Sequence, residues 1–313
     1  MLRKEGLLRL FNTLKKGNTV YAPVEKEGYY IYSCVEDFSE IAIEFTLPLY
    51  PPKEFLLPQH EEILSFNMRG VRATLPNVKQ VIFGVRPCDV NAINIMTQFM
   101  LSEPPDPYYQ ARREGTLIVA IQCTQQFENC FCAVFGTYKL STGYDILLTP
   151  SNRGYYVTYG TRAGKRLLEK AGIKPDNKQP TVEFKPTRKQ AKFHSKIQEL
   201  DKYFNSKYWG VAAKDCFSCG GCTIVCPTCQ CFDVDDHTNL DMKSGSRIRT
   251  WDSCQLKPFT RVAGNIFFRK NREERFRHRY FHKLSWGDNC VGCGRCLTIC
   301  PTRIDMIEVV LKL

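Results

Sequence analysis

The chain of 313 residues contains 16 cysteines, and eight of them form two copies of one pattern. In each copy, gaps of two, two and three residues separate the cysteines, and a proline follows the last one. In bacterial ferredoxins this spacing brings three thiolates to one [4Fe–4S] cube, while the fourth binds the neighbouring cube. We therefore predict two [4Fe–4S] clusters. The cysteines are Cys216, Cys219, Cys222 and Cys226 in the first run, and Cys290, Cys293, Cys296 and Cys300 in the second.

The exchanged fourth ligand determines how the eight cysteines divide between the clusters. We assign cluster one to Cys216, Cys219, Cys222 and Cys300, and cluster two to Cys290, Cys293, Cys296 and Cys226. Glycines beside the ligands would let backbone amides approach the inorganic sulfides; they are Gly220, Gly221, Gly292 and Gly294. The alternative is a zinc ribbon, which needs two C-x2-C pairs, so two complete four-cysteine runs disfavour it.

Four further cysteines stand in the amino-terminal half of the chain. Cys88 follows the apolar stretch 79–85, and Cys123 follows a second apolar stretch, 116–122. If these stretches are neighbouring parallel strands, both sulfurs lie at one carboxyl edge, where α/β sheets place ligands. Cys130 and Cys132 follow within one loop. On spacing alone, a third [4Fe–4S] cluster bound by these four cysteines (cluster three) and a set of scattered core thiols remain equally open.

Three cysteines between the ferredoxin runs have no diagnostic spacing: Cys229, Cys231 and Cys254. They could bind a further cluster with a non-cysteine ligand such as Asp252 or His237. They could equally be buried thiols packed near the cubes, and we favour this reading because cysteine without a ligand role is often a small core residue. Cys34 has no partner pattern and is interpreted as structural.

The elements that position the cysteines follow from hydrophobic periodicity. The stretches 79–85 and 116–122 are short, apolar and β-branched, which is typical of buried strands. Between them, 90–101 has helical spacing after Asp89, a suitable N-cap, so the segment predicts a right-handed strand–helix–strand unit. At the start, Leu7, Leu10, Phe11 and Leu14 recur at helical spacing, which predicts an amphipathic helix within 1–18.

Further along, we predict β-like stretches at 19–23 and 41–45, a hairpin through 144–148 and 154–159, and helices at 162–172 and 189–206. A segment rich in Pro, Lys and Asn, 173–188, marks the domain boundary. The predicted fold is an amino-terminal α/β domain, 1–185, carrying cluster three. It is followed at 186–313 by a helical linker and a ferredoxin-like domain with two [4Fe–4S] clusters and a long insertion between the cysteine motifs.

The net charge of +12 could indicate nucleic acid, but each oxidised cluster with four thiolates carries about −2 and offsets part of it. Seven basic residues crowd the segment 269–283, which we interpret first as a solvated basic face and second as a docking surface for an acidic subunit. No G-x-G-x-x-G occurs, and the stretch 160–166 lacks the phosphate-loop spacing. No apolar run approaches about 18 residues and no leader opens the sequence, which predicts a cytoplasmic chain without a membrane span.

Taken in order, the motifs resemble one known family of iron–sulfur subunits. The family is shared by two cytoplasmic complexes: it supplies the beta subunit of NAD(P)-linked nickel–iron hydrogenases (sulfhydrogenases) and an iron–sulfur subunit of anaerobic sulfite reductase. The likeness covers nearly the whole chain. It rests on GVRPCDVNAI (84–93), IQCTQQFENCFC (121–132), the ferredoxin runs with CPTCQC (226–231) and WDSCQ (251–255) between them, YPPKEFLLP (50–58) and PPDPYYQARRE (104–114).

The resemblance implies a non-catalytic electron-transfer subunit, without flavin or nucleotide of its own, that works with an FAD- and NAD(P)H-binding flavoprotein. Its catalytic partner would be a nickel–iron hydrogenase, ranked slightly ahead of a sulfite reductase. Because the family pattern includes the cysteines matching Cys88, Cys123, Cys130 and Cys132, the resemblance favours cluster three. The stretch 264–269 departs from the family's Gly-Gly-His sequence, which bears on the partner that this loop meets.

Two other functions remain open. One is a redox enzyme subunit that binds flavin in its amino-terminal domain, as in coenzyme-reducing hydrogenase subunits with a similar Pro-Cys turn. The other, favoured only by net charge, is an iron–sulfur protein that binds nucleic acid.

Overall fold

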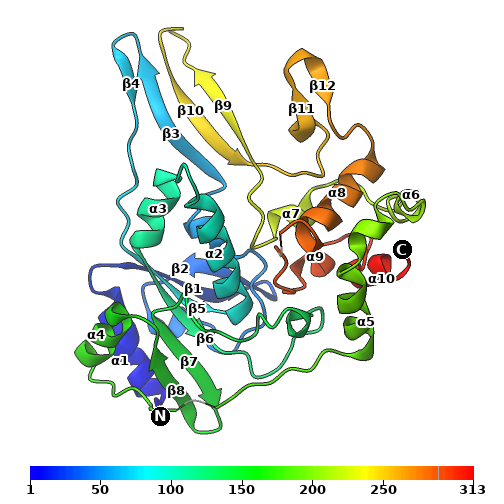
Figure 1. The fold of residues 1–313 in the computed structure, drawn as a ribbon. Helices are drawn as coiled ribbons and strands as arrows, with labels where there is room; N and C mark the ends of the chain where they lie inside the picture. Colours follow the sequence, from blue (N-terminus) through cyan, green and yellow to red (C-terminus); the bar gives the residue numbers. More distant parts are fainter. Residues whose placement is uncertain (179, 288) are drawn as a thin grey trace. The chain divides into compact units, whose positions relative to one another are not determined.

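The computed structural model describes residues 1–178, 180–287 and 289–313, which form two compact units (Figure 1). Unit one comprises Met1–Leu56, Pro76–Lys185 and Val291–Cys293. Unit two comprises Leu57–Leu75, Pro186–Cys290 and Gly294–Leu313. Gln179, within the segment interpreted as the domain boundary, lies outside the described residues.

Unit one is built on a six-stranded sheet with the order β2-β1-β5-β6-β7-β8. The middle strands β1, β5, β6 and β7 are parallel, and the edge strands β2 and β8 are antiparallel to their neighbours. Because β5 and β6 are adjacent and parallel, the predicted strand–helix–strand unit is confirmed. The bounds are β1 Thr19–Lys26, β2 Tyr29–Cys34, β5 Gln80–Val85, β6 Thr116–Ile121, β7 Ile146–Ser151 and β8 Gly154–Tyr159.

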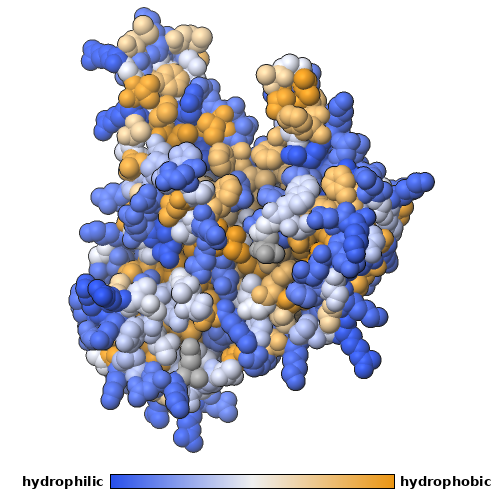
Figure 2. All heavy atoms as spheres, in the orientation of Figure 1, coloured by the Kyte–Doolittle hydropathy of each residue, from blue (hydrophilic) through white to orange (hydrophobic). Residues whose placement is uncertain are grey.

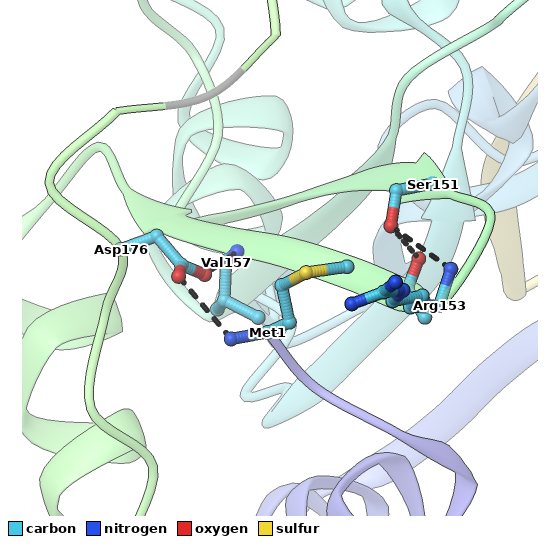
Figure 3. A network of polar contacts seen from close by, with 6 residues as sticks. Met1, Ser151, Arg153, Val157 and Asp176 are labelled. Atoms are coloured by element: carbon cyan, nitrogen blue, oxygen red, sulfur yellow. Dashed lines mark hydrogen bonds and ion pairs between the residues drawn. The ribbon is translucent and has the colours of Figure 1, made fainter.

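Four helices belong to unit one: α1 (Lys4–Lys15), α2 (Pro87–Met100), α3 (Pro107–Glu114) and α4 (Arg162–Lys170). The predicted apolar face of α1 is buried in one core with side chains of the sheet and of α4. The chain start is fixed as well, since the Met1 ammonium lies 3.2 Å from the Asp176 carboxylate, which accepts the Val157 amide at 2.8 Å (Figure 3).

Two local predictions for unit one are wrong. Helix α2 begins at Pro87 with Arg86 as its N-cap, and Asp89 lies buried inside the helix. Proline suits the first helical position because the missing amide hydrogen would have no partner there, so the helix starts earlier than the Asp89 signal indicated. The stretch 41–45 is not a strand; it follows a single 3-10 turn, Phe38–Glu40, with Ile41 and Phe45 buried in the core.

Unit two combines a four-stranded antiparallel sheet, of order β4-β3-β10-β9, with short helices. A buried ion pair joins Glu61 of β3 to Arg249 of β10 at 2.5 Å. The strands are β3 His60–Asn67, β4 Gly70–Arg72, β9 Phe232–Thr238 and β10 Ser244–Trp251, and a small hairpin is formed by β11 Arg261–Val262 and β12 Ile266–Phe267.

The helices of unit two are α5 Arg188–Ile197, α6 Tyr208–Ala212, α7 Gly221–Ile224, α8 Arg272–Leu284, α9 Arg295–Thr298 and α10 Met306–Leu311. The predicted helix at 189–206 therefore ends early, at Ile197, and a 3-10 turn, Leu200–Tyr203, follows. Lys189 ties α5 to the start of α10 through Asp305 at 3.0 Å and Glu308 at 2.6 Å. Each cysteine run includes one short helix, α7 with Cys222 in the first run and α9 with Cys296 in the second, and these helices contact each other.

Candidate iron–sulfur centres

Unit two encloses a cavity of about 50 Å³ that receives cysteines from both ferredoxin runs. Five cysteines line it: Cys216, Cys219 and Cys222 of the first run, and Cys296 and Cys300 of the second. The cavity includes all four ligands assigned to cluster one, which fits the exchanged fourth ligand expected of this motif. Cys296, which is assigned to cluster two, lines the same cavity.

The two runs fold alike around their ligands. Helices α7 and α9 each begin after a glycine in the left-handed region, Gly220 at φ 79° and Gly294 at φ 81°, where other residues are strained. Each run then ends in Cys-Pro-Thr, and the threonine hydroxyl meets the cysteine sulfur. The distance is 3.3 Å for Thr228 and Cys226 and 3.5 Å for Thr302 and Cys300.

Backbone amides also point at the sulfurs assigned to cluster one. The Ser218 amide donates to the Cys216 sulfur at 3.4 Å, and the Ile304 amide donates to the Cys300 sulfur at 3.4 Å. Amide hydrogen bonds stabilise thiolate charge and tune the potential of a cluster bound there. Burial raises the pKa of Cys222 to about 12, so this thiol without metal holds its proton, which iron binding would displace.

The cysteines assigned to cluster two are divided between the units. Cys226, Cys290 and Cys296 belong to unit two, whereas Cys293 is buried in unit one, where its carbonyl oxygen accepts the Cys130 thiol at 3.5 Å. Burial alone would raise the pKa of Cys226, but the nearby charges of Lys283 and Arg279 outweigh it and lower that pKa. At Cys296 burial prevails and raises the pKa.

Unit one brings together the four cysteines assigned to cluster three. They line one cavity of about 10 Å³ at the carboxyl ends of β5 and β6; they are Cys88, Cys123, Cys130 and Cys132. Burial raises the pKa of Cys123 to about 11 and that of Cys132 to about 12, and Cys130 adds to both shifts. This cavity is smaller than the one in unit two, and the iron content of the chain tests whether cluster three is bound there.

The three extra cysteines also converge, in unit two. The Cys231 thiol forms hydrogen bonds with Cys229 and Cys254, which raise the pKa of Cys231, and Gln255 donates to the Cys254 sulfur at 3.7 Å. Asp252 is half-buried with Cys229 nearby, whereas His237 is exposed on β9. The burial of Cys229 and Cys254 is consistent with packed thiols, and the exposure of His237 disfavours it as a ligand.

Helix α8 contains the functional side chains that the sequence pattern did not reveal. The segment 269–283 was interpreted as a solvated basic face, but Arg275, Arg279 and Lys283 are only 8%, 6% and 4% exposed. Their spacing of four residues places them on one face of the helix. That spacing is the signal that could have revealed a buried cationic stripe, whereas Lys270 and Arg272 remain exposed.

In the described part of the chain, no three His, Cys, Asp or Glu side chains are arranged to hold a metal ion. In a cube each thiolate binds its own iron, so its ligands surround a cavity instead of meeting at one ion. Among the described helices, none is long and apolar enough to cross a membrane.

Comparison with known proteins covers the region of both ferredoxin runs and nearly the whole chain. Residues 215–304 match the family model of the 4Fe-4S dicluster domain. The chain is also 37% identical over 322 residues to the sulfhydrogenase 2 subunit beta of Pyrococcus furiosus, an alignment that covers 98% of this chain and 96% of the relative. No solved structure matches the chain significantly. The chain therefore belongs to the sulfhydrogenase beta-subunit family of iron–sulfur proteins.

Proposed function

We propose that the chain is a cytoplasmic, non-catalytic electron-transfer subunit of a multisubunit hydrogenase, with clusters one and two in the ferredoxin-like part and cluster three in the α/β part. The observation that carries the proposal is the cavity in unit two, which is lined by Cys216, Cys219 and Cys222 of one run together with Cys300 of the other. Each cluster, when bound, takes up and releases one electron; the protein supplies the ligands, the amide donors and a dry surrounding.

The proposed partners follow from the family. The relative's name describes a subunit of a sulfhydrogenase, so we propose that this chain connects an FAD- and NAD(P)H-binding flavoprotein to a catalytic hydrogenase subunit. The proposed domains are 1–185 and 186–313, although the structure groups Leu57–Leu75 with unit two and Val291–Cys293 with unit one. We propose that the chain binds no flavin, nucleotide or nucleic acid. A sulfite reductase is the second candidate for the catalytic partner, and the proteins that co-purify with the chain would distinguish the two.

The conduit role predicts that the isolated chain does not oxidise NAD(P)H. The expected result is reduction of its clusters by NAD(P)H only after the flavoprotein is added, because iron–sulfur clusters accept single electrons, whereas a flavin accepts the hydride of NAD(P)H. The measurement is the loss of cluster absorbance under anaerobic conditions with and without the flavoprotein. Oxidation of NAD(P)H by the isolated chain at the rate of the complex would contradict the proposal.

One observation favours the flavin alternative. A cavity of about 640 Å³ lies in unit one, lined by Arg86 after β5, Cys123 after β6 and the aromatic side chains Tyr30 and Tyr155. Its volume is within the range of small-molecule sites, and the carboxyl edge of parallel strands is a common place for them. Flavin retained by the anaerobically purified isolated chain would support this alternative over the conduit role.

The β11–β12 hairpin is a better candidate for contact with another subunit than the basic segment 269–283, whose Arg275, Arg279 and Lys283 are buried. The hairpin β11–β12 and the residue that follows it expose apolar side chains: Val262 is 42%, Ile266 57% and, directly after β12, Phe268 71% exposed. Figure 2 shows the orange side chains gathered on this hairpin. Clustered exposed apolar groups commonly mark protein interfaces. This hairpin also contains most of the stretch 264–269, where the sequence departs from the family pattern.

We therefore expect Ile266→Asp combined with Phe268→Asp to weaken assembly with the neighbouring subunit. The loss should be at least about tenfold in affinity, because truncating an interface anchor commonly costs about 2 kcal/mol. Co-purification with the partner subunits measures the effect. The matched control, Leu240→Asp together with Met242→Asp, changes exposed apolar residues of another loop in the same unit. Equal losses in both variants, or none in the first, would exclude the β11–β12 hairpin as the specific contact.

A further inference from the structure

The cationic stripe of α8 follows both sets of ferredoxin cysteines. Arg275, Arg279 and Lys283 are four residues apart, so the stripe extends about 12 Å along the helix. Arg275 lies near Cys216 of the first run, while Lys283 lies near Cys226 and Cys290. The stripe therefore begins at a ligand assigned to cluster one and ends at ligands assigned to cluster two.

Arg279 occupies the middle of the stripe and contacts both sets. Its guanidinium donates to the Cys222 carbonyl oxygen at 3.2 Å, hydrogen-bonds the Cys296 thiol and lines the cavity assigned to cluster one. Its Nε is buried and has no hydrogen-bond partner among the described residues.

The contacts at the ends of the stripe are different. Lys283 donates to the carbonyl oxygen of Thr228 at 2.9 Å and to its hydroxyl at 3.1 Å, and that hydroxyl lies 3.3 Å from the Cys226 sulfur. Arg275 mainly binds backbone, donating to the Gln255 carbonyl oxygen at 2.9 Å and the Lys270 carbonyl oxygen at 3.2 Å. Lys283 thus lies at the site assigned to cluster two only, whereas Arg279 contacts a ligand of each cluster, Cys222 and Cys296.

Burying a cation without a counter-charge is costly, whereas a cube with four thiolates supplies about −2. Taking up an electron makes the cube still more negative, so a fixed cation at its wall favours the reduced state. We propose that Arg279 is a positioning residue that raises the reduction potentials of clusters one and two together, with Lys283 adding to cluster two alone. The inference rests on the proposed ligand assignment. It adds a role for α8, which lies between the two cysteine runs, in setting the reduction potentials of both clusters.

The test is a redox titration of the full-length chain, followed by electron paramagnetic resonance, in four variants with their iron content measured. Arg279→Gln should lower the equilibrium constant for one-electron reduction of both ferredoxin-type clusters at least about tenfold, which corresponds to about 59 mV. Lys283→Met should lower the constant for one cluster and leave the other unchanged. Arg279→Lys keeps the charge and should give a smaller shift at both clusters. Arg272→Met removes an exposed charge from the same helix and should shift neither.

Unshifted potentials in an Arg279→Gln protein with wild-type iron content would overturn the proposal, as would a shift confined to one cluster. If the Arg279→Gln protein loses its clusters, the Lys283→Met protein tests the proposal instead. Unchanged potentials in Lys283→Met would refute the idea that the buried cations of α8 set the potentials. An iron content below about eight per wild-type chain would instead overturn the ligand assignment on which the inference rests.

Discussion

Replacing Cys226 by alanine should remove cluster two and leave cluster one intact, although Cys226 belongs to the run that supplies most ligands of cluster one. The reason is the exchange of the fourth ligand between the two ferredoxin runs. In the structure Cys300 lines one cavity with Cys216, Cys219 and Cys222, and Cys296 lines it as well. This common cavity is the observation on which the proposed reciprocal exchange rests. Iron should fall from about twelve to about eight atoms per chain, and electron transfer through the complex should be lost.

Two comparison variants make this result specific. Cys290→Ala should give the same spectrum as Cys226→Ala, because both cysteines are assigned to cluster two. Cys219→Ala should give the other spectrum, that of a chain without cluster one. Cys34→Ala changes an exposed cysteine of β2 and should keep all iron. A Cys226→Ala protein whose spectrum matches Cys219→Ala would show that each run binds its own cluster.

The fold of unit one could be predicted in part from local patterns because its central strands are continuous apolar stretches. Strands β5 and β6 are continuous apolar runs, and helix α1 has apolar residues at helical spacing. Nearly all residues predicted to be buried in these three elements are buried in the structure. The sheet of unit two had no such signal. Strand β9 is exposed along nearly all of its length, and it pairs with β10 only through a register that no local pattern specifies. Long-range pairing, not propensity, determines these strands.

For the candidate centres, cysteine spacing was informative and charge was misleading. Eight ligands could be assigned because each ferredoxin run is a local loop whose geometry follows from its spacing. The basic residues of α8 were interpreted as solvated because Arg and Lys are rarely buried without a partner. Here Arg279 has the sulfurs of Cys222 and Cys296 as neighbours, and these come from segments 57 and 17 residues away in sequence. Only the folded chain brings them together.

Cluster three gives the other large effect that we predict. Cys132→Ala should remove it, lowering iron from about twelve to about eight atoms per chain, while the potentials of clusters one and two stay unchanged. Cys132 is 7% exposed and shares its cavity with Cys88, Cys123 and Cys130. Burial raises the pKa of Cys123 and Cys132, so these two thiols remain neutral without metal, and they can deprotonate when bound iron neutralises their charge.

The competing interpretation is a set of core thiols, and it predicts a different result for the same variant. A buried thiol that only packs can be replaced by alanine at a modest cost in stability, without any change in iron. Cys254→Ala is the matched control, since Cys254 is also buried near other cysteines, with a hydrogen bond to Cys231, but belongs to unit two. Full iron in Cys132→Ala would refute cluster three. Loss of four irons in Cys132→Ala, with full iron in Cys254→Ala, would establish cluster three and show that Cys229, Cys231 and Cys254 are packed thiols.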